Sequence, residues 1–416
     1  MAQAIQNVTN IIKNAYLPAF ANQLTTDASP FLEKIKKVPL ASNDIVASAP
    51  IGFNGGVGFG GPDSAATPDS GPQNYVQFKT KAHDLYCNIE ISDKVIKLAS
   101  SNQGAMLNAL DTEVKSAYTA SEFNLGRVLF GNGTGILGAI TASASSSTTI
   151  YVSSPVTVRE GMIIDAYANT SATASGTSPV TAGARVIQVD RTYNSSNKGY
   201  AVTLDKAVTA ATALTSDSAT ASGTYGFITL QKSYNREFTG LGAVMDDKTA
   251  SIYGVSKSSN LWVKPTVIDV DNSIGDVILY KGVKEAQDFK NSKIDMILMG
   301  DNAFQAYQTY MRTNNTVYVD KTMKFKGGAV GYTVVVGNRE VVVVNERFVP
   351  TNESWGVDTT AWELHHTQLD FADESGATPF TLVPGYSYYR ALLTMYGDFI
   401  CKNPGGCVKY INCNNV

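Results

Sequence analysis

The stretch from residue 50 to residue 75 constrains the fold most, because it is rich in glycine and proline yet carries apolar side chains. Its large apolar residues are Phe53, Val57 and Phe59, so it is not a plain solvated linker. Strand-like segments flank it, Asp44–Ala49 before it and Tyr75–Ile91 after it, and together they predict a long β-hairpin arm. Ordering ~25 such residues costs on the order of 25–50 kcal/mol of backbone entropy. Few apolar side chains are available locally to offset that cost, so the arm is expected to need a partner surface.

The N-terminal residues form a second segment without a partner of its own. Between residues 3 and 24 apolar side chains recur at helical spacing, and Pro18 ends or bends the predicted helix. A single amphipathic helix at a terminus must either fold back or lie on a neighbouring subunit. We therefore expect contacts between subunits at Ile5, Ile12, Tyr16, Phe53, Val57, Phe59, Tyr75 and Phe78.

The clearest predicted helix covers residues 102–130. Ser101 or Asn102 can cap it, and Gly131-Asn132-Gly133 ends it with a turn. About 28 residues at 1.5 Å each give a rod ~40 Å long, which indicates a structural spine. The side chains expected to pack this spine helix are Leu107, Leu110, Val114, Tyr118, Leu125 and Leu129.

Composition changes between residues 139 and 228, where Ser, Thr and Ala dominate and helical periodicity is absent. Short strand-like segments separated by polar turns are Ser147–Val152, Met162–Ala168, Ala184–Val189 and Tyr200–Leu204. Strands at this spacing are typical of a small β-sandwich or barrel. We expect an all-β domain inserted into the chain.

The remainder of the chain has mixed character. Expected elements are an extended segment at Ser251–Trp262, helices over Ser273–Phe289 and Asp301–Met311, a buried strand at Ile294–Met299, a hairpin around Gly337-Asn338, and aromatic-rich strands over Trp355–Phe371 and Ser387–Cys401. The predicted fold class is therefore α+β, with a small all-β insertion domain.

Charge and composition exclude several classes of function. The net charge is −3 with a pI near 5.7, so no global electrostatic attraction to nucleic acid is expected. No run reaches the ~18 apolar residues of a membrane helix, and the N-terminus lacks the apolar core of a signal peptide. We expect a soluble protein made in the cytoplasm, with free thiols at Cys87, Cys401, Cys407 and Cys413.

Candidate chemical motifs are weak. The Gly55–Gly61 run superficially resembles a dinucleotide loop, but it continues into Pro62-Asp63 rather than a helix. His365-His366 lies among strand residues, where the two side chains point to opposite faces. Asp246-Asp247 could hold a cation, although turn formation is the default role of such residues. No catalytic, cofactor-binding or metal-binding residues are predicted, and the chain is not expected to be an enzyme.

Three segments together resemble the major capsid proteins of tailed bacteriophages with the Hong Kong 97-type fold. The first is the end of the predicted spine helix with the loop that follows, Leu129–Gly138. The second is Asn235–Leu241, followed by Ile252–Val255 and Trp262. The third is the closing strand Arg390–Cys401 with Lys402–Gly406. Their order, with the hairpin arm ahead of the long helix, extends the resemblance over nearly the whole chain except the predicted insert.

The resemblance implies a division of the chain. Residues 1–43 would be an N-terminal arm, 44–91 an extended loop (E-loop) over an adjacent subunit, 92–138 a peripheral domain with the spine helix, 139–228 the inserted β-domain, 229–372 an axial domain with peripheral-domain segments, and 373–416 a C-terminal peripheral-domain strand.

The resemblance also implies a role in assembly. Such proteins form hexamers and pentamers that tile an icosahedral head shell around double-stranded DNA without sequence-specific binding. The partners implied are a separate scaffolding protein, a portal and a decoration protein, with no membrane and no cofactor, and the location implied is the virion. The predicted arm helix begins almost at Met1, so no proteolytic trimming is expected. A Lys–Asn cross-link between subunits is not assigned, because no motif identifies its residues.

Two other classes of function stay open from the residues alone. A secreted adhesin or tail-fibre subunit would suit the Ser/Thr-rich insert, but it does not explain the spine helix, the missing signal or the unpaired cysteines. An enzyme would need convergent titratable groups, and only three histidines occur in the chain. Particle size separates the three, since a capsid gives megadalton assemblies, a fibre gives trimers and an enzyme gives small species.

Overall fold

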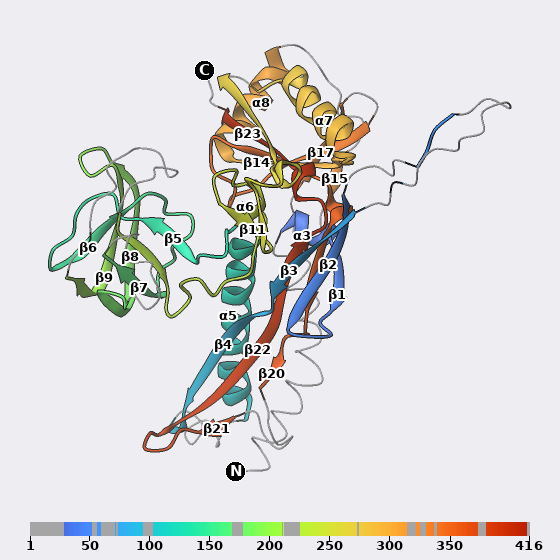
Figure 1. The fold of residues 1–416 in the computed structure, drawn as a ribbon. Helices are drawn as coiled ribbons and strands as arrows, with labels where there is room; N and C mark the ends of the chain where they lie inside the picture. The colour runs from blue at the N-terminus through green and yellow to red at the C-terminus, as the bar shows by residue number, and fades with distance from the viewer. Residues whose placement is uncertain are drawn as a thin grey trace. The chain divides into compact units, whose positions relative to one another are not determined.

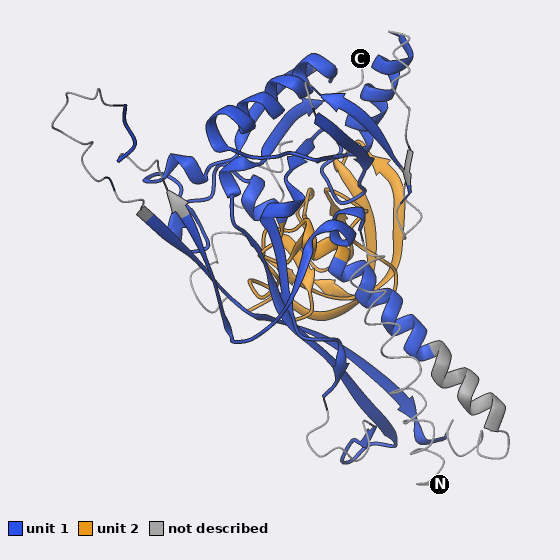
Figure 2. Ribbon diagram, turned by 90° about the vertical axis from the view of Figure 1, so that its right-hand side faces the viewer, with its two compact units in different colours: residues 1–125, 241–416 blue, residues 126–240 orange. Residues whose placement is uncertain are grey.

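The computed structural model describes residues 29–51, 56–59, 71, 74–94, 103–168, 178–209, 211, 225–272, 274–313, 322–324, 330–336, 339–372 and 380–413. The chain divides into two units, residues 1–125 with 241–416 (unit 1) and residues 126–240 (unit 2), which Figure 2 colours separately. Each unit has its own sheets and its own hydrophobic core. The amphipathic helix predicted near the N-terminus lies outside the described residues.

The predicted spine helix is present as α5, Gln103–Leu129 (Figure 1). It ends as its sequence indicates, because the amide of Gly131 turns back to the Val128 carbonyl at 2.9 Å, and Gly133 and Gly135 then take positive φ. In unit 1, the Cys87 thiol donates to the Ala117 carbonyl of α5 at 3.7 Å. The helix therefore packs along the strand that carries Cys87.

A six-stranded sheet in unit 1 is built around one long strand, β22 (Tyr388–Cys401). Its order is β1 (Lys36–Pro39), β19 (Trp362–His366), β22 and β20 (Asp370–Phe371), and β4 (His83–Ser92) and β21 (Thr381–Leu382) also pair with β22. The β4–β22 ladder is antiparallel and runs from Ser92 opposite Tyr388 to His83 opposite Gly397. Segments roughly 300 residues apart in sequence thus lie side by side.

Unit 1 also contains a seven-stranded sheet. Its order is β13 (Thr266–Asn272), β23 (Val408–Cys413), β18 (Ser354–Val357), β14 (Met296–Met299), β17 (Arg339–Asn345), β16 (Val330–Val336) and β15 (Thr322–Lys324). Helices α7 (Asp276–Lys290) and α8 (Asp301–Thr313) cover one face (Figure 1) and share an apolar core with it. Both helices and the β16–β17 hairpin agree with the sequence prediction.

Unit 2 is made of strands apart from the end of α5. Its sheet has the order β5 (Ile136–Ala139), β10 (Phe227–Leu230), β7 (Ile163–Tyr167), β8 (Thr181–Asn194), β9 (Gly199–Val208) and β6 (Ser147–Val152). A bridge between Ile140 and Val152 joins the two ends of this order. The sheet thereby closes on itself around a core of Ile, Val, Leu and Ala side chains, as in a small barrel.

The predicted hairpin arm differs from expectation in its second strand. Strand β2 (Asp44–Ile51) pairs with β3 (Asn74–Lys81) in antiparallel register. Strand β3 ends before Ala82, and the following residues form β4 in the six-stranded sheet. Strand β22 offers β4 ten consecutive partners, so residues 83–92 leave the hairpin. The hairpin is therefore a two-stranded ribbon that ends at Lys81.

Short elements complete unit 1. They are helices α3 (Pro30–Lys34) and α6 (Leu241–Met245), strands β11 (Ser251–Ile252) and β12 (Val255–Ser256), and 3-10 turns η3 (Leu261–Val263), η4 (Thr359–Ala361) and η5 (Pro404–Gly406). The predicted extended segment Ser251–Trp262 begins instead as a tight hairpin of β11 and β12, because Tyr253 and Gly254 both take positive φ, and it ends in η3.

Candidate assembly surface

One face of the β2–β3 hairpin is buried in its own chain. Ile45, Ala47 and Ala49 on β2 are buried, and Phe78 on β3 pairs with Ala47 and has no exposed surface. The Phe78 ring packs 5.9 Å from the rings of both Tyr253 and Trp262. A ring without exposed surface has none to offer a second subunit, so the structure corrects the expectation for Phe78: it anchors the hairpin on its own subunit.

Polar contacts fix the base of the hairpin as well. The Lys79 amide donates to the Tyr253 carbonyl at 3.0 Å. The Thr80 hydroxyl donates to the carboxylate of Asp398, which is fully buried on β22. His83 Nδ1 lies 3.6 Å from Asp398 Oδ2. Asp398 therefore ties both β3 and β4 to the same strand, on either side of the break at Ala82.

The opposite face and the described part of the tip are exposed. Val46 and Tyr75 lie on the outer face of the ribbon and are exposed. At the tip, Val57 is 69% exposed and Phe59 is fully exposed. Single exposed apolar residues are common, but a ribbon with one packed face and an apolar tip is a surface suited to a partner. Phe53, the remaining predicted contact of the arm, lies outside the described residues.

The chain that leads from the N-terminal segment is held by unit 1. Phe31 on α3 is fully buried and packs edge-on against Trp362 with ring centres 5.7 Å apart. The Ser29 hydroxyl donates to Glu346 at 2.9 Å, and β1 pairs in parallel with β19. Residues 29–39 therefore pack on their own chain, while the predicted contacts Ile5, Ile12 and Tyr16 lie outside the described residues.

Two carboxylates at this root have shifted pKa values in opposite directions. Burial raises the pKa of Glu346 to about 7, against the smaller effects of the Ser29 hydrogen bond and of Arg347. Burial also opposes ionisation of Glu363, but hydrogen bonds from Lys402 and Lys36 outweigh it and lower the pKa of Glu363 to about 2. Glu363 is thus a satisfied structural anion, whereas Glu346 changes its charge near neutral pH.

Most of the described residues that were predicted to pack the spine helix are buried. Val114, Leu125 and Leu129 are buried, and Tyr118 is half-buried. Leu107 and Leu110 belong to the part of α5 whose side chains are not described. On unit 1, Phe123 of α5 meets Phe348 with ring centres 5.5 Å apart, and the Arg347 guanidinium lies over both rings.

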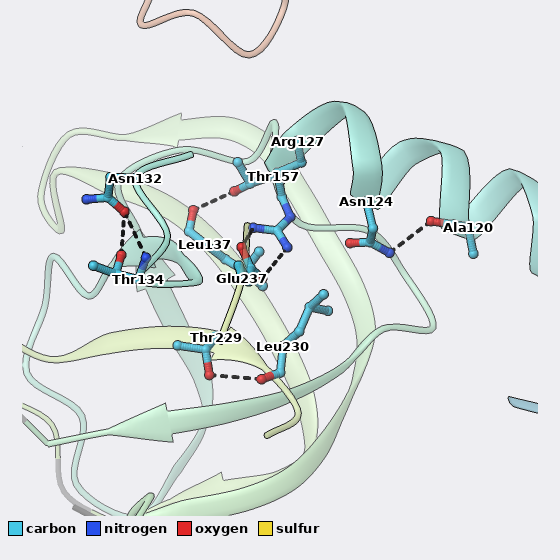
Figure 3. A network of polar contacts seen from close by, with 10 residues as sticks. All are labelled: Ala120, Asn124, Arg127, Asn132, Thr134, Leu137, Thr157, Thr229, Leu230 and Glu237. Carbon is cyan, nitrogen blue, oxygen red and sulfur yellow. Dashed lines mark hydrogen bonds and ion pairs between the residues drawn. The ribbon is translucent and has the colours of Figure 1, made fainter. Parts of the chain in front are cut away.

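The first segment of the resemblance, which follows α5, meets the beginning of the second, Asn235–Gly240, in unit 2 (Figure 3). Arg127, at the end of α5, donates two hydrogen bonds to Glu237, one of them 2.9 Å long, and both side chains are more than nine-tenths buried. The Asn235 amide donates to the Thr134 carbonyl at 2.9 Å. Gly240 lies so close to the Leu129 and Val128 carbonyls that a Cβ would clash there. The two ends of unit 2 are therefore clasped together.

Within the described residues there is little sign of catalytic chemistry. No group of three His, Cys, Asp or Glu side chains there could hold a metal ion, and no described helix is long and apolar enough to cross a membrane. All four cysteines are free thiols. Lys257, which the sequence did not single out, is buried with its ammonium bonded to the Ala243 carbonyl at 3.1 Å and to Thr249 at 2.8 Å.

Comparison with known proteins gives structural likeness without a sequence relative. Neither a family model nor a curated protein matches the chain. The cyanophage A-1(L) capsid asymmetric unit is 11% identical, with a TM-score of 0.49, over 96% of this chain and 94% of that chain. The chain is similar to Hong Kong 97-type shell proteins.

Two further solved structures are also similar to the chain. The satellite phage P4 procapsid is 9% identical, with a TM-score of 0.39, over 97% of this chain and 92% of that chain. The SrpI encapsulin of Synechococcus elongatus is 8% identical, with a TM-score of 0.43, over 94% of this chain and 89% of that chain.

Proposed function

We propose that the chain is the major capsid protein of a tailed bacteriophage, which self-assembles into hexamers and pentamers of an icosahedral head shell around double-stranded DNA. The observation that carries this proposal is the β2–β3 hairpin. Its inner face is anchored on its own subunit, whereas its outer face and tip present Val46, Tyr75, Val57 and Phe59 to solvent. Such a ribbon offers an apolar contact to a neighbouring copy.

The energy available from this contact suits repeated assembly. Fully burying a Val or Phe side chain contributes about 1.5–3 kcal/mol. Val57 and Phe59 together therefore contribute about 3–6 kcal/mol per contact before ordering and association costs. That is modest for one pair of subunits. It suffices for a shell, because a closed shell repeats the contact once for every subunit.

The proposed division of the chain keeps the boundaries implied by the resemblance. Residues 1–43 would be the N-terminal arm, 44–91 the E-loop, 92–138 and 373–416 would belong to the peripheral domain, and 229–372 would supply the axial domain. Residues 139–228, which contain most of the strands of unit 2, would be an inserted β-domain that projects from the shell.

The remaining partners follow from the same proposal. A mildly acidic chain suits a shell lining that encloses DNA without gripping it tightly. A separate scaffolding protein would assist assembly, a portal would occupy one vertex, and a decoration protein would bind outside. The assembled location would be the virion.

The test uses electron microscopy and mass measurement of the purified full-length chain, alone and with residues 51–74 deleted. The full chain should form closed shells of megadalton mass, and the deletion variant should remain a folded subunit without shells. Replacing Ser195 and Ser196, both exposed in the β8–β9 turn, by alanine is the control and should leave shells intact. Trimers from the full chain would support a fibre subunit instead, and closed shells from the 51–74 deletion would contradict the role given to the hairpin.

A further inference from the structure

Two of the four cysteines share one buried site in unit 1. Cys401 is the last residue of β22, and Cys407 directly follows the turn η5. Neither residue has more than 1% of its surface exposed. The two thiols are hydrogen-bonded to each other. Residues 401 and 407 therefore place two oxidisable sulfur atoms in direct contact, away from solvent.

The chain between the two cysteines is held in place by its surroundings. Through residues 402–406 it passes from β22 in the six-stranded sheet to β23 in the seven-stranded sheet. The Asn403 side-chain amide donates to the Lys290 carbonyl at 3.0 Å. A Cβ at Gly405 would clash with the Trp262 carbonyl. This turn is packed on both sides, so it keeps the cysteines at its two ends together.

The Tyr253 side chain connects the thiol pair to the β2–β3 hairpin. Its hydroxyl accepts a hydrogen bond from the Cys401 amide at 3.3 Å. Its ring packs 5.9 Å from the ring of Phe78, and its carbonyl accepts the Lys79 amide at 3.0 Å. The thiol pair thus lies beside the residue on which the hairpin is anchored.

The other two cysteines have separate contacts. The Cys87 thiol donates to the Ala117 carbonyl of α5 at 3.7 Å. The Cys413 thiol, on β23, is hydrogen-bonded to Ser354 of the neighbouring strand β18. These two thiols are therefore internal controls for any chemistry of the first pair.

Burial keeps Cys401 unreactive in the closed subunit. It raises the pKa of the Cys401 thiol well above its ordinary value, and the contact with the Cys407 thiol raises this pKa further. The thiolate is the form that attacks disulfides, so Cys401 reacts only slowly until the turn opens. A reducing cytoplasm also favours free thiols.

We propose that Cys401 and Cys407 form an intrachain disulfide once the chain leaves a reducing environment, and that this bond fixes the turn between the two sheets of unit 1. The reduced pair is then the form of the newly made subunit. The bond itself does not depend on the proposed shell function. Its use in particles rests on that function, because a head released from its host leaves the reducing cytoplasm.

The oxidant is a low-molecular-weight disulfide such as oxidised glutathione. The thiolate of one cysteine attacks it, which forms a mixed disulfide and expels one glutathione thiolate. The thiolate of the other cysteine attacks the protein sulfur of this mixed disulfide, which forms the Cys401–Cys407 bond and expels the second glutathione thiolate. The two cysteines together lose two electrons and two protons, and oxidised glutathione is reduced to two thiols.

Peptide mapping tests the bond in dissociated full-length subunits. The subunits are incubated with oxidised glutathione, free thiols are blocked with N-ethylmaleimide, and trypsin is added without reductant. Cleavage after Lys402 separates the two cysteines, so the bond should join peptide 391–402 to peptide 403–409. Peptides 82–94 and 410–416, which carry Cys87 and Cys413, should be recovered alkylated. Alkylated Cys401 and Cys407, or a bond to either control cysteine, would overturn the proposal.

Thermal unfolding tests whether the bond stabilises the subunit. The oxidised chain should be a monomer on a non-reducing gel and should unfold at a temperature about 2–6 °C higher than the reduced chain. Dithiothreitol should abolish the difference. Cys407→Ser should lose the gain, whereas the matched control Cys413→Ser, which replaces another buried thiol, should keep it. A gain that persists in Cys407→Ser would overturn the assignment to this pair.

The outcomes separate this inference from the proposed function. The linked peptide from a chain that forms no particles would support the bond and overturn the shell function. Particles whose subunits give no linked peptide would do the reverse. In particles that carry the bond, the guanidinium concentration needed for dissociation should be higher than in particles kept reduced. Equal concentrations would overturn the stabilising role of the bond in the shell.

Discussion

At the scale of single residues, the structure gives buried polar groups roles that local sequence cannot reveal. Glu346 accepts a hydrogen bond from Ser29, a residue 317 positions away, and Glu237 binds Arg127 across 110 positions. Periodicity marks neither carboxylate, although Glu237 lies within the Asn235–Leu241 segment of the resemblance. Their importance comes from burial, since a buried charge must be paired or change its protonation state.

Glu346 makes stability depend on pH in a defined direction. Its pKa rises from 4.5 to about 7 in the folded chain, so the folded state binds more protons than the unfolded state between these values. The stability attributable to this group is fully present below the unfolded pKa and is lost as pH rises through about 7, a change of about 3 kcal/mol. Glu346→Gln, which does not titrate, should remove this dependence. Denaturant unfolding of both chains between pH 4.5 and pH 8 measures it, and parallel curves for the two chains would count against the assignment.

The Arg127–Glu237 pair is the second residue-scale prediction. Arg127→Met leaves the Glu237 carboxylate buried without its partner, which typically costs about 3–5 kcal/mol. Thermal unfolding followed by near-ultraviolet circular dichroism should show a clear loss of stability. Lys284→Met removes an exposed ion pair with Asp288 and should leave the unfolding midpoint unchanged. Equal behaviour of the two variants would exclude a clasp at the ends of unit 2.

At the scale of elements, the sequence predicted best what local periodicity determines. The helix predicted over 102–130 is α5 at 103–129. Three of the four strand segments predicted in the insert fall within β6, β8 and β9, and the fourth, Met162–Ala168, extends one residue beyond each end of β7. Pairing across the chain was harder to predict. Residues 83–91 alternate as well for a hairpin as for a sheet, and only the distant strand β22 decides between them.

Phe78 shows the same limit in a candidate site residue. Its alternation with exposed neighbours on β3 fits a contact between subunits as well as a contact within one. Tyr253 and Trp262, which bury it, lie far along the chain in a segment expected to be extended. The prediction therefore identified the alternation of side chains between the two faces of the ribbon, but it assigned Phe78 to a contact with another subunit instead of its own.

The hairpin offers a direct contrast between its two faces. Phe78→Ala removes a fully buried ring and should cost about 3–5 kcal/mol of subunit stability. Phe59→Ala, at the exposed tip, should leave subunit stability unchanged and weaken assembly. Thermal unfolding and sedimentation of both variants separate the two effects. A destabilised subunit from Phe59→Ala would mean that the tip packs on its own chain.

The spine helix should be required for folding itself. Val114 is buried on α5, and Val114→Glu places a charge in that apolar contact at a cost of at least about 3 kcal/mol. The variant should be insoluble or largely unfolded by circular dichroism. Ser116→Glu, two positions along and exposed, should fold normally. A well-folded Val114→Glu subunit would remove the helix from the core.

At the scale of the whole molecule, a single copy of the chain leaves apolar side chains of the hairpin exposed to solvent. Val57 and Phe59 at the hairpin tip are apolar and exposed, whereas each unit has a hydrophobic core of its own. In the proposed shell a neighbouring copy would cover this exposed apolar surface.

The most direct measurement is the reactivity of a cysteine placed at the hairpin tip. A Phe59→Cys chain should react rapidly with a maleimide as a dissociated subunit, because this position is fully exposed there. In assembled particles the same thiol should react at least tenfold more slowly, since a neighbouring copy covers it. Equal rates in subunits and in intact particles would contradict the central claim that the hairpin tip contacts another copy.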